Sequence, residues 1–317
     1  MRNQDSVFTT LKTRIRVPTR TAEWALIPIG DMHYGNNKCD IDRLKDTVQY
    51  GKSLMKKMPV YFVLMGDELD ITSKAERAAL GASKLHDSTY DMIDIHVRTI
   101  GLELLKLLEP LKGHTLAVVE GNHKWVFSQA YDKYDIRAGE TNSQWLARQL
   151  KAQWAGFLSY LRICVDTASC AREVSTKNEE YHVDIVACHG KGGAKLLGTS
   201  VNQVNDLRTI FPTADVYMFG HDHQKLAVPV SCLQVSAHSP RFERDQPLIV
   251  KERMQFLCRT GSFQRGYVPN ESSFVVGGLF RPSVLGVIEL RICCRSRSTT
   301  MENGRANVLV TSIKAIN

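Results

Sequence analysis

Residues 24–33 read WALIPIGDMH, a mostly apolar run from Trp24 to Ile29 that ends abruptly in Gly30-Asp31-Met32-His33. The apolar run predicts a buried strand. In an extended backbone, residues two apart point to the same face, so Asp31 and His33 can reach one metal ion. A single Asp-x-His pair is common, however, and by itself favours a loop with two solvated polar residues.

The same pattern recurs along the chain. Four further apolar runs end in metal-ligand residues: Val60–Met65 before Gly66-Asp67, Thr115–Val119 before Gly121-Asn122-His123, Val183–Ala187 before His189-Gly190, and Val216–Phe219 before Gly220-His221-Asp222-His223. Five such strand ends predict a sheet whose strands converge on one site.

The ordered series of blocks resembles the calcineurin-like metallophosphoesterases, a superfamily of two-metal phosphatases, phosphodiesterases and nucleases. The blocks that carry the resemblance are Asp31-x-His33, Gly66-Asp67-x-x-Asp70, Gly121-Asn122-His123, His189 and Gly220-His221-x-His223. They cover about residues 24–223 in the order of the family. Residues 189–193 and 260–263 also resemble members carried by phages and prophages.

Holding two divalent ions close together needs an anionic bridge, and Asp67 is the residue at its strand end suited to that role. The resemblance implies two ligand sets that share this bridge: Asp31, His33 and His223 with Asp67, and Asn122, His189 and His221 with Asp67. Imidazole and carboxylate ligands without thiolate favour Mn, Fe or Zn over Ca. We expect two divalent ions, Mn first, with Fe, Zn or Mg as alternatives.

The resemblance leaves His123 off the metals and implies that it is the general acid for the leaving group, oriented by the carboxylate of Asp70. The family usually has Asp or Glu after the Asn-His pair, whereas this chain has Lys124. A cation there would lower the pKa of His123, contact a substrate phosphate, or lie solvated and inert.

Two more groups are candidates for substrate binding. Trp125 and Phe127 follow His123 closely and either line the pocket or belong to the core of an aromatic-rich insertion. Lys191, in the glycine-rich segment after His189, is a candidate phosphate contact. Its spacing is not that of a P-loop, because the four-residue gap before Gly-Lys is absent.

We expect an α/β fold, the four-layer α/β/β/α sandwich of the family, as a single domain over residues 1–317. A helical insertion is expected over about 72–112, as two helices closed by Pro110, and the aromatic-rich insertion over about 124–156. A helix is expected over Ile41–Lys57 with Asp40 as its cap. Other expected elements are strand 157–165, surface loop 168–180, helix 196–211, and strands near 227–235, 254–258, 284–292 and 308–313.

The composition fits a globular protein with a core: 317 residues, 43% of them hydrophobic. There is no apolar leader and no run near the roughly 20 residues of a membrane span, so we expect a cytoplasmic protein of a bacterium or a phage-infected cell, with no membrane partner. The eight cysteines show no metal-binding spacing. Residues 1–20 and residues 291–317 each hold five basic residues against one acid, which together account for the net charge of +8. The residues between these two segments therefore carry no net formal charge.

The resemblance therefore implies a metal-dependent phosphoesterase, in which metal-activated water hydrolyses a phosphate ester. The first candidate is a phosphodiesterase acting on nucleotides or nucleic acid, because of the aromatic insertion and the phage-like segments. The alternative is a phosphomonoesterase for a protein or a small molecule. A third hypothesis, a catalytically dead relative that serves as a binding scaffold, is disfavoured because every ligand position is filled.

Overall fold

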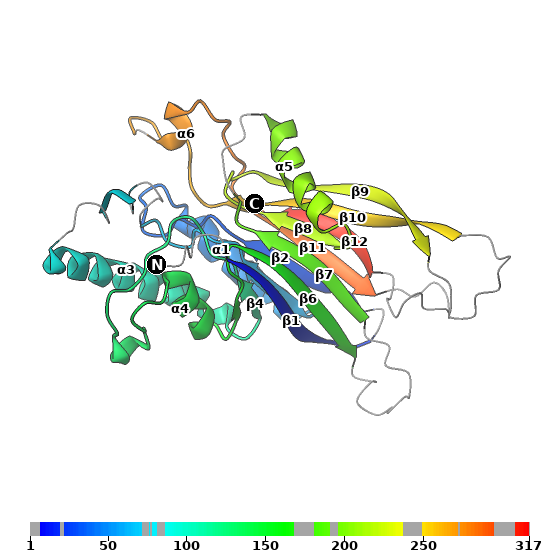
Figure 1. Cartoon of the computed structure of the whole chain (residues 1–317), viewed down its shortest axis with the longest axis horizontal. Helices are drawn as coiled ribbons and strands as arrows, with labels where there is room; N and C mark the ends of the chain where they lie inside the picture. Colours follow the sequence, from blue (N-terminus) through cyan, green and yellow to red (C-terminus); the bar gives the residue numbers. More distant parts are fainter. Residues whose placement is uncertain are drawn as a thin grey trace.

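The computed structural model describes residues 7–19, 22–71, 76, 78–80, 86–167, 181–190, 196–236, 249–271, 273–294 and 308–316. The chain forms a mixed α/β structure with one large sheet and helices packed against it (Figure 1). Its strands are β1 (Phe8–Val17), β2 (Trp24–Ile29), β3 (Val60–Leu64), β4 (Thr115–Val118), β5 (Gln153–Trp154), β6 (Leu158–Thr167), β7 (Tyr181–Cys188), β8 (Val216–Phe219), β9 (Lys225–Ser236), β10 (Ile249–Ser262), β11 (Gly286–Cys294) and β12 (Val308–Ile316). The strand order is β1-β6-β7-β8-β10-β11-β2-β3-β4-β5, with β9 on β10 and β12 on β11.

The two sheets that the sequence predicts are joined into one path. Strand β10 pairs with β11 over only two positions, Gly261 with Val287 and Ser262 with Gly286. Gly261 makes this join possible: its φ is +88°, and a Cβ there would lie 2.0 Å from the carbonyl oxygen of Gly286. The two expected sheets therefore meet at this corner, where a glycine lets the backbones approach, and the four-layer arrangement stays a prediction.

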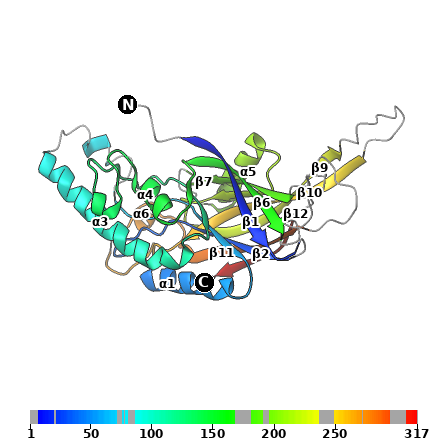
Figure 2. The same cartoon turned by 90° about the horizontal axis from the view of Figure 1, so that it is seen from below.

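The opposite ends of the path, β1 and β5, also approach each other, which leaves the sheet nearly closed. Figure 2 shows β1 beside β6 at one of these ends. The backbone N–H of Phe157 donates to the carbonyl of Val7 at 3.0 Å. The hydroxyl of Thr9 donates to the carbonyl of Ala155 at 2.5 Å, beside β5. Strand β1 was not predicted, because its exposed face carries basic side chains and the strand has no clear apolar run.

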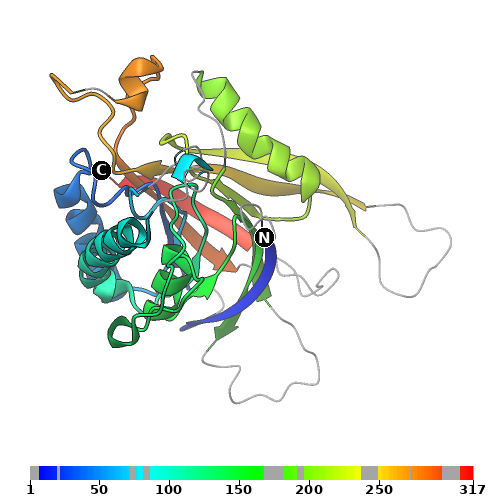
Figure 3. The ribbon, with the colours of Figure 1, turned by 60° about the vertical axis from the view of Figure 1, so that its left-hand side comes forward.

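The helices cover the two halves of the sheet unequally (Figure 3). Helices α1 (Ile41–Met55), α3 (Asp87–Leu108) and α4 (Asn142–Gln149) share one apolar cluster with β2, β3 and β4. Helix α5 (Leu197–Ile210) packs a smaller cluster on β7, β8 and β10. Side chains from both halves of the sheet fill a third cluster between them. None of the described helices is long and apolar enough to cross a membrane.

Local sequence explains where the helices begin and end. The side chain of Asp40 accepts a hydrogen bond from the backbone N of Arg43 at 3.2 Å, which confirms it as the cap of α1. Helix α3 passes into a 3₁₀ turn, Glu109–Leu111, at Pro110, as predicted. The first helix expected in this insertion falls on residues that are mostly outside the described ones, as does the expected loop 168–180.

Candidate metal centre

The ends of five strands bring the predicted ligands to one place. Asp31 and His33 follow β2, Asp67 and Asp70 follow β3, Asn122 and His123 follow β4, His189 follows β7, and His221 and His223 follow β8. Among the described residues, three groups place their ligand atoms within 4.8 Å of one another: Asp31, His33 and His223; Asp67, His189 and His221; and His33, Asp70 and His123. The first group holds three residues of one predicted ligand set, and the second holds three of the other, so the sets themselves stay a prediction.

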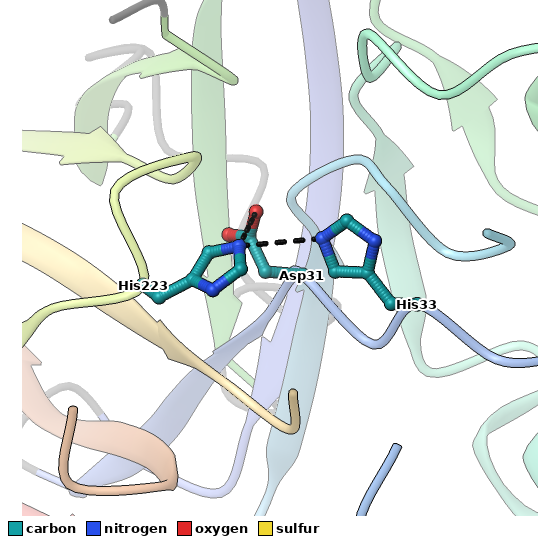
Figure 4. A group of neighbouring side chains, drawn as sticks. All are labelled: Asp31, His33 and His223. Atoms are coloured by element: carbon teal, nitrogen blue, oxygen red, sulfur yellow. Dashed lines mark hydrogen bonds and ion pairs between the residues drawn. The ribbon is translucent and has the colours of Figure 1, made fainter. Parts of the chain in front are cut away.

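The first group lies at the carboxyl end of β2 and is drawn in Figure 4. The Nε2 atom of His223 lies 3.6 Å from Asp31 Oδ1 and 3.3 Å from His33 Nε2. The Oδ2 atom of Asp67 is 3.9 Å from His33 Nε2. Two ring nitrogens and two carboxylates therefore face a common point.

The second group lies on the other side of Asp67. The Nε2 atom of His189 is 3.1 Å from Asp67 Oδ2, 2.9 Å from Asn122 Oδ1 and 3.3 Å from His221 Nδ1. One carboxylate oxygen, Asp67 Oδ2, therefore reaches toward both groups. The other oxygen, Oδ1, accepts the backbone N–H of His123 at 2.8 Å. Asp67 Oδ2 therefore lies between the two groups, and its role as a bridging ligand stays a prediction.

A hydrogen bond to the backbone fixes which ring nitrogen of His189 is free to bind a metal. His189 Nδ1 lies 2.8 Å from the carbonyl oxygen of Met65, which can only accept, so Nδ1 carries the proton. The Nε2 lone pair of neutral His189 then faces the oxygens of Asp67 and Asn122. Lone pairs facing one another at 2.9–3.1 Å repel unless a cation or a proton lies between them. The donor set could therefore hold a metal ion, and a proton on Nε2 would relieve the same repulsion.

Burial and neighbouring charges shift the pKa values of this cluster strongly. Burial raises the pKa of Asp31 to about 7, with a further rise from the charge of Asp67. Burial lowers the pKa of His221 to about 4, helped by the positive charge of His189. For His189, burial acts to lower the pKa, but Asp67 and Asp31 outweigh it and raise the pKa to about 10. Without an ion, a proton on His189 takes over part of the charge balance.

The backbone at these ligands is left-handed, and this corrects one step of the sequence analysis. Five of the predicted ligands have positive φ: Asp31 (49°), His33 (47°), Asp67 (50°), His221 (71°) and His223 (60°). Asp31 and His33 therefore converge through turns and not, as expected, through strand alternation. Such φ values are uncommon outside glycine and persist where the surroundings enforce them, often at functional sites. Here the backbone N–H groups of Asp31 and His33 donate to Gly66 O at 3.0 Å and Asp67 O at 2.9 Å.

Asp70 lies between a ligand histidine and the predicted acid. Its Oδ1 atom is 3.2 Å from His33 Nδ1 and 3.1 Å from His123 Nδ1. The N–H of His123 is not aligned with that oxygen, so this second contact is an ion-pair distance and not a formed hydrogen bond. Burial acts to raise the pKa of Asp70, but His123, His33 and Asn36 together hold it well below its usual range. The His123 side chain is 23% exposed, so a ligand can reach it.

Three of the four predicted substrate contacts are buried in the structure. Lys124 is 5% exposed, which excludes a freely solvated side chain. Trp125 and Phe127 are 5% and 1% exposed and belong to the apolar cluster under α1, α3 and α4. The indole N–H of Trp125 donates to the buried carboxylate of Asp94. Both rings therefore lie in a core, and their contact with a substrate stays a prediction. Lys191 lies outside the described residues.

Sequence reasoning missed two buried glutamates that stand next to ligand residues. Glu68 follows Asp67 and accepts the hydroxyl of Ser143 at 2.9 Å. Glu120 accepts the hydroxyl of Thr141 at 2.9 Å and the indole N–H of Trp154 at 2.7 Å. Both acids tie ligand loops to the start of α4. Their position directly beside the ligand blocks was the signal available in the sequence.

Comparison with known proteins finds no matching family model and no matching curated protein. Solved structures that resemble the chain include a predicted phosphoesterase from Streptococcus pneumoniae TIGR4, at 12% identity and a TM-score of 0.31, covering 86% of this chain and 83% of that one. A single mutant of Vps29 from Entamoeba histolytica has 11% identity and a TM-score of 0.34, covering 92% and 99%. Vacuolar Protein Sorting 29 from Cryptosporidium parvum has 10% identity and a TM-score of 0.32, covering 93% and 100%. At scores this low, the similarity supports no conclusion about activity. Any function proposed for this chain therefore rests on the residues of the site.

Proposed function

We propose that this chain is a metal-dependent phosphoesterase that holds two divalent ions. The observation that carries the proposal is the position of Asp67 Oδ2, 3.1 Å from His189 Nε2 in one ligand group and 3.9 Å from His33 Nε2 in the other. A carboxylate between two imidazole sets suits a bridged pair of cations. Manganese is the first ion to test, because the donors are imidazole and oxygen.

Each ligand group has its own residues. Asp31, His33 and His223 would hold one ion, Asn122, His189 and His221 the other, and Asp67 both. Bound divalent ions would neutralise charge on the phosphoryl oxygens and lower the pKa of water, so that a nucleophile forms near neutral pH. The protein keeps the ligands in place from the backbone: Asp31 accepts the N–H of His221 at 2.9 Å, and Asp67 accepts the N–H of His123 at 2.8 Å.

His123 would deliver the proton that a poor leaving group needs. The carboxylate of Asp70, whose Oδ1 lies 3.1 Å from His123 Nδ1, would orient the imidazole for this step. The partial exposure of His123 contrasts with the buried ligands and leaves its ring accessible from solvent. Because Asp70 also contacts His33, the acid and the ligand group are fixed relative to each other.

We propose a phosphodiester of a nucleotide or nucleic acid as the substrate class, with a phosphomonoester as the alternative carried from the sequence. The buried rings of Trp125 and Phe127 reduce the support that the aromatic insertion gives to a nucleotide. For the architecture, we propose a four-layer sandwich whose two sheets have joined at Gly261. The three hydrophobic clusters, separated by the two halves of the sheet, support this description.

Purified protein assayed with a chromogenic phosphodiester and the matching monoester, with and without Mn²⁺, tests the proposal. We expect metal-dependent turnover that is faster for the diester. Faster monoester turnover would replace the substrate class and keep the reaction class. Metal binding without turnover of either ester would instead favour the binding-scaffold hypothesis.

A further inference from the structure

Arg259 is a fully buried cation that contacts no proposed ligand side chain. It lies in β10, paired in register with Phe219 of β8, and its guanidinium carbon is 4.4 Å from the centre of the Phe219 ring. Its Nε and one terminal nitrogen donate to the carbonyl of Ser200 at 3.1 and 2.9 Å. The other terminal nitrogen donates to the carbonyl of Gly220 at 2.9 Å. Gly220 begins the loop that carries two ligand histidines.

The anion that faces Arg259 is Asp222, the residue between His221 and His223. Arg259 Nε lies 3.3 Å from Asp222 Oδ2, and the two side chains are 0% and 1% exposed. Asp222 Oδ2 also accepts the hydroxyl of Ser200, and Oδ1 accepts the backbone N–H of Gln224 at 3.1 Å. Hydrogen bonds of the ion pair therefore restrain the ligand loop at both ends: Arg259 donates to the carbonyl of Gly220, and Asp222 accepts from the backbone of Gln224.

The loop needs these restraints because two of its residues have an unfavourable backbone conformation. His221 and His223 have φ values of 71° and 60°, in the left-handed region that non-glycine residues avoid. Without restraint, either residue relaxes toward negative φ and swings its imidazole away from the other ligands. A planar guanidinium with several fixed donors can hold two carbonyls and a carboxylate at once, which a lysine ammonium cannot do with the same geometry.

We propose that Arg259 and Asp222 are positioning residues that hold His221 and His223 in the left-handed conformation required for metal binding. The expected effect on metal binding rests on the proposed metal-dependent function. The restraint of the loop by Arg259 and Asp222 is a property of the metal-free chain. The proposal assigns a role to a buried ion pair that makes no direct contact with substrate or metal in the mechanism above.

The test compares Arg259→Lys and Arg259→Met with a matched control, Arg253→Met. Arg253 lies on the same strand and forms a partly buried ion pair with Asp215, away from the ligand loop. Two quantities are measured: amide hydrogen exchange at residues 220–224 in the metal-free protein, and the affinity for Mn²⁺ by equilibrium dialysis. Arg259→Lys keeps the charge, so it provides a folded variant if Arg259→Met does not fold.

We expect both Arg259 variants to exchange amides 220–224 faster than wild type and to bind Mn²⁺ about 10–100-fold more weakly, the range typical for loss of a group that orients a ligand. Arg259→Lys should lose less than Arg259→Met, and Arg253→Met should match wild type in both measurements. Unchanged exchange in folded Arg259→Lys, or equal losses in Arg253→Met, would overturn the inference. If the wild type binds no Mn²⁺ while exchange still rises in Arg259→Lys, the positioning role stands and the proposed function fails.

Discussion

The imidazole of His123 lies against the carboxylate of Asp70, with Nδ1 3.1 Å from Oδ1. The same oxygen is 3.2 Å from Nδ1 of His33. One carboxylate oxygen therefore serves a proposed proton donor on one side and a proposed metal ligand on the other. This arrangement supports the proposal that His123, although close to the candidate metal ligands, has a separate role.

Replacing His123 with alanine should slow hydrolysis of an ester with a poor leaving group by roughly 10²–10⁴-fold, because its proton donor is lost. The loss should be much smaller for a nitrophenyl ester, whose leaving group departs without a proton. Steady-state kcat/KM for the two esters, with bound metal measured in parallel, checks this. Equal losses on both esters, or loss of metal, would assign His123 to binding instead.

Replacing Asp67 with asparagine should leave the fold intact and abolish turnover, because a neutral amide cannot hold two dications together. The amide oxygen can still accept the 2.8 Å hydrogen bond from the backbone N of His123. Activity and metal content are compared with those of Asp42→Asn, which alters an exposed carboxylate paired with Lys45. An Asp67→Asn protein that keeps more than a few per cent of wild-type activity with Mn²⁺ would contradict the bridging role.

The buried acid Glu68 should make the metal-free protein less stable as the pH rises. Burial, with the charges of Glu120 and Asp67, raises the pKa of Glu68 to about 8, against 4.5 for an ordinary glutamate. Between these values the folded state keeps a proton that the unfolded state has lost. The contribution of Glu68 to stability is therefore complete below pH 4.5 and falls by at most about 1.4 kcal/mol per pH unit until pH 8.

Glu68→Gln removes this titration, so its stability relative to wild type should rise steadily from pH 5 to pH 8 in denaturant unfolding. Glu109→Gln is the control, because the Glu109 side chain is 59% exposed and pairs only loosely with Lys112 at 3.6 Å. Parallel stability curves for wild type and Glu68→Gln would show that Glu68 is ionised throughout this range.

Replacing Trp125 with leucine should lower the free energy of unfolding by about 1–3 kcal/mol, because it leaves a cavity and removes one of the hydrogen-bond donors to Asp94. Since the ring is 5% exposed, turnover of a nucleotide diester and of a small chromogenic diester should fall by the same factor. The ratio of kcat/KM for the two substrates measures this. Selective loss on the nucleotide diester, by the roughly 5- to 150-fold expected of a stacked base, would show that the ring contacts substrate.

Much of the fold could be predicted because apolar runs and caps are local signals. The helix after Asp40 and the strands that carry the ligands lie where the pattern puts them. Strand β1 could not be predicted in this way, since Lys12, Arg14 and Arg16 fill its exposed face and conceal the alternation. The join between β10 and β11 depends on the close approach of Gly261 to Gly286, a contact between distant residues that no local pattern reports.

In the candidate site, too, the local features could be predicted and the contacts between distant residues could not. The ligand types and their order were visible at the strand ends, and the structure brings them within reach of one another. Their left-handed backbone was not visible, because the turn at Asp31 depends on its hydrogen bond to Gly66 from the neighbouring strand end. The partnership of Arg259 and Asp222 also joins residues from separate elements, so sequence spacing gave no indication of it.

The metal content of the purified chain tests the central claim most directly. After loading with Mn²⁺ and removal of free ion by gel filtration, elemental analysis should give about two ions per chain. Chelation should abolish phosphoesterase activity, and added Mn²⁺ should restore it. If the wild-type chain retains no more ion than Asp67→Asn, or if chelation leaves turnover unchanged, the strand ends do not form a two-metal centre.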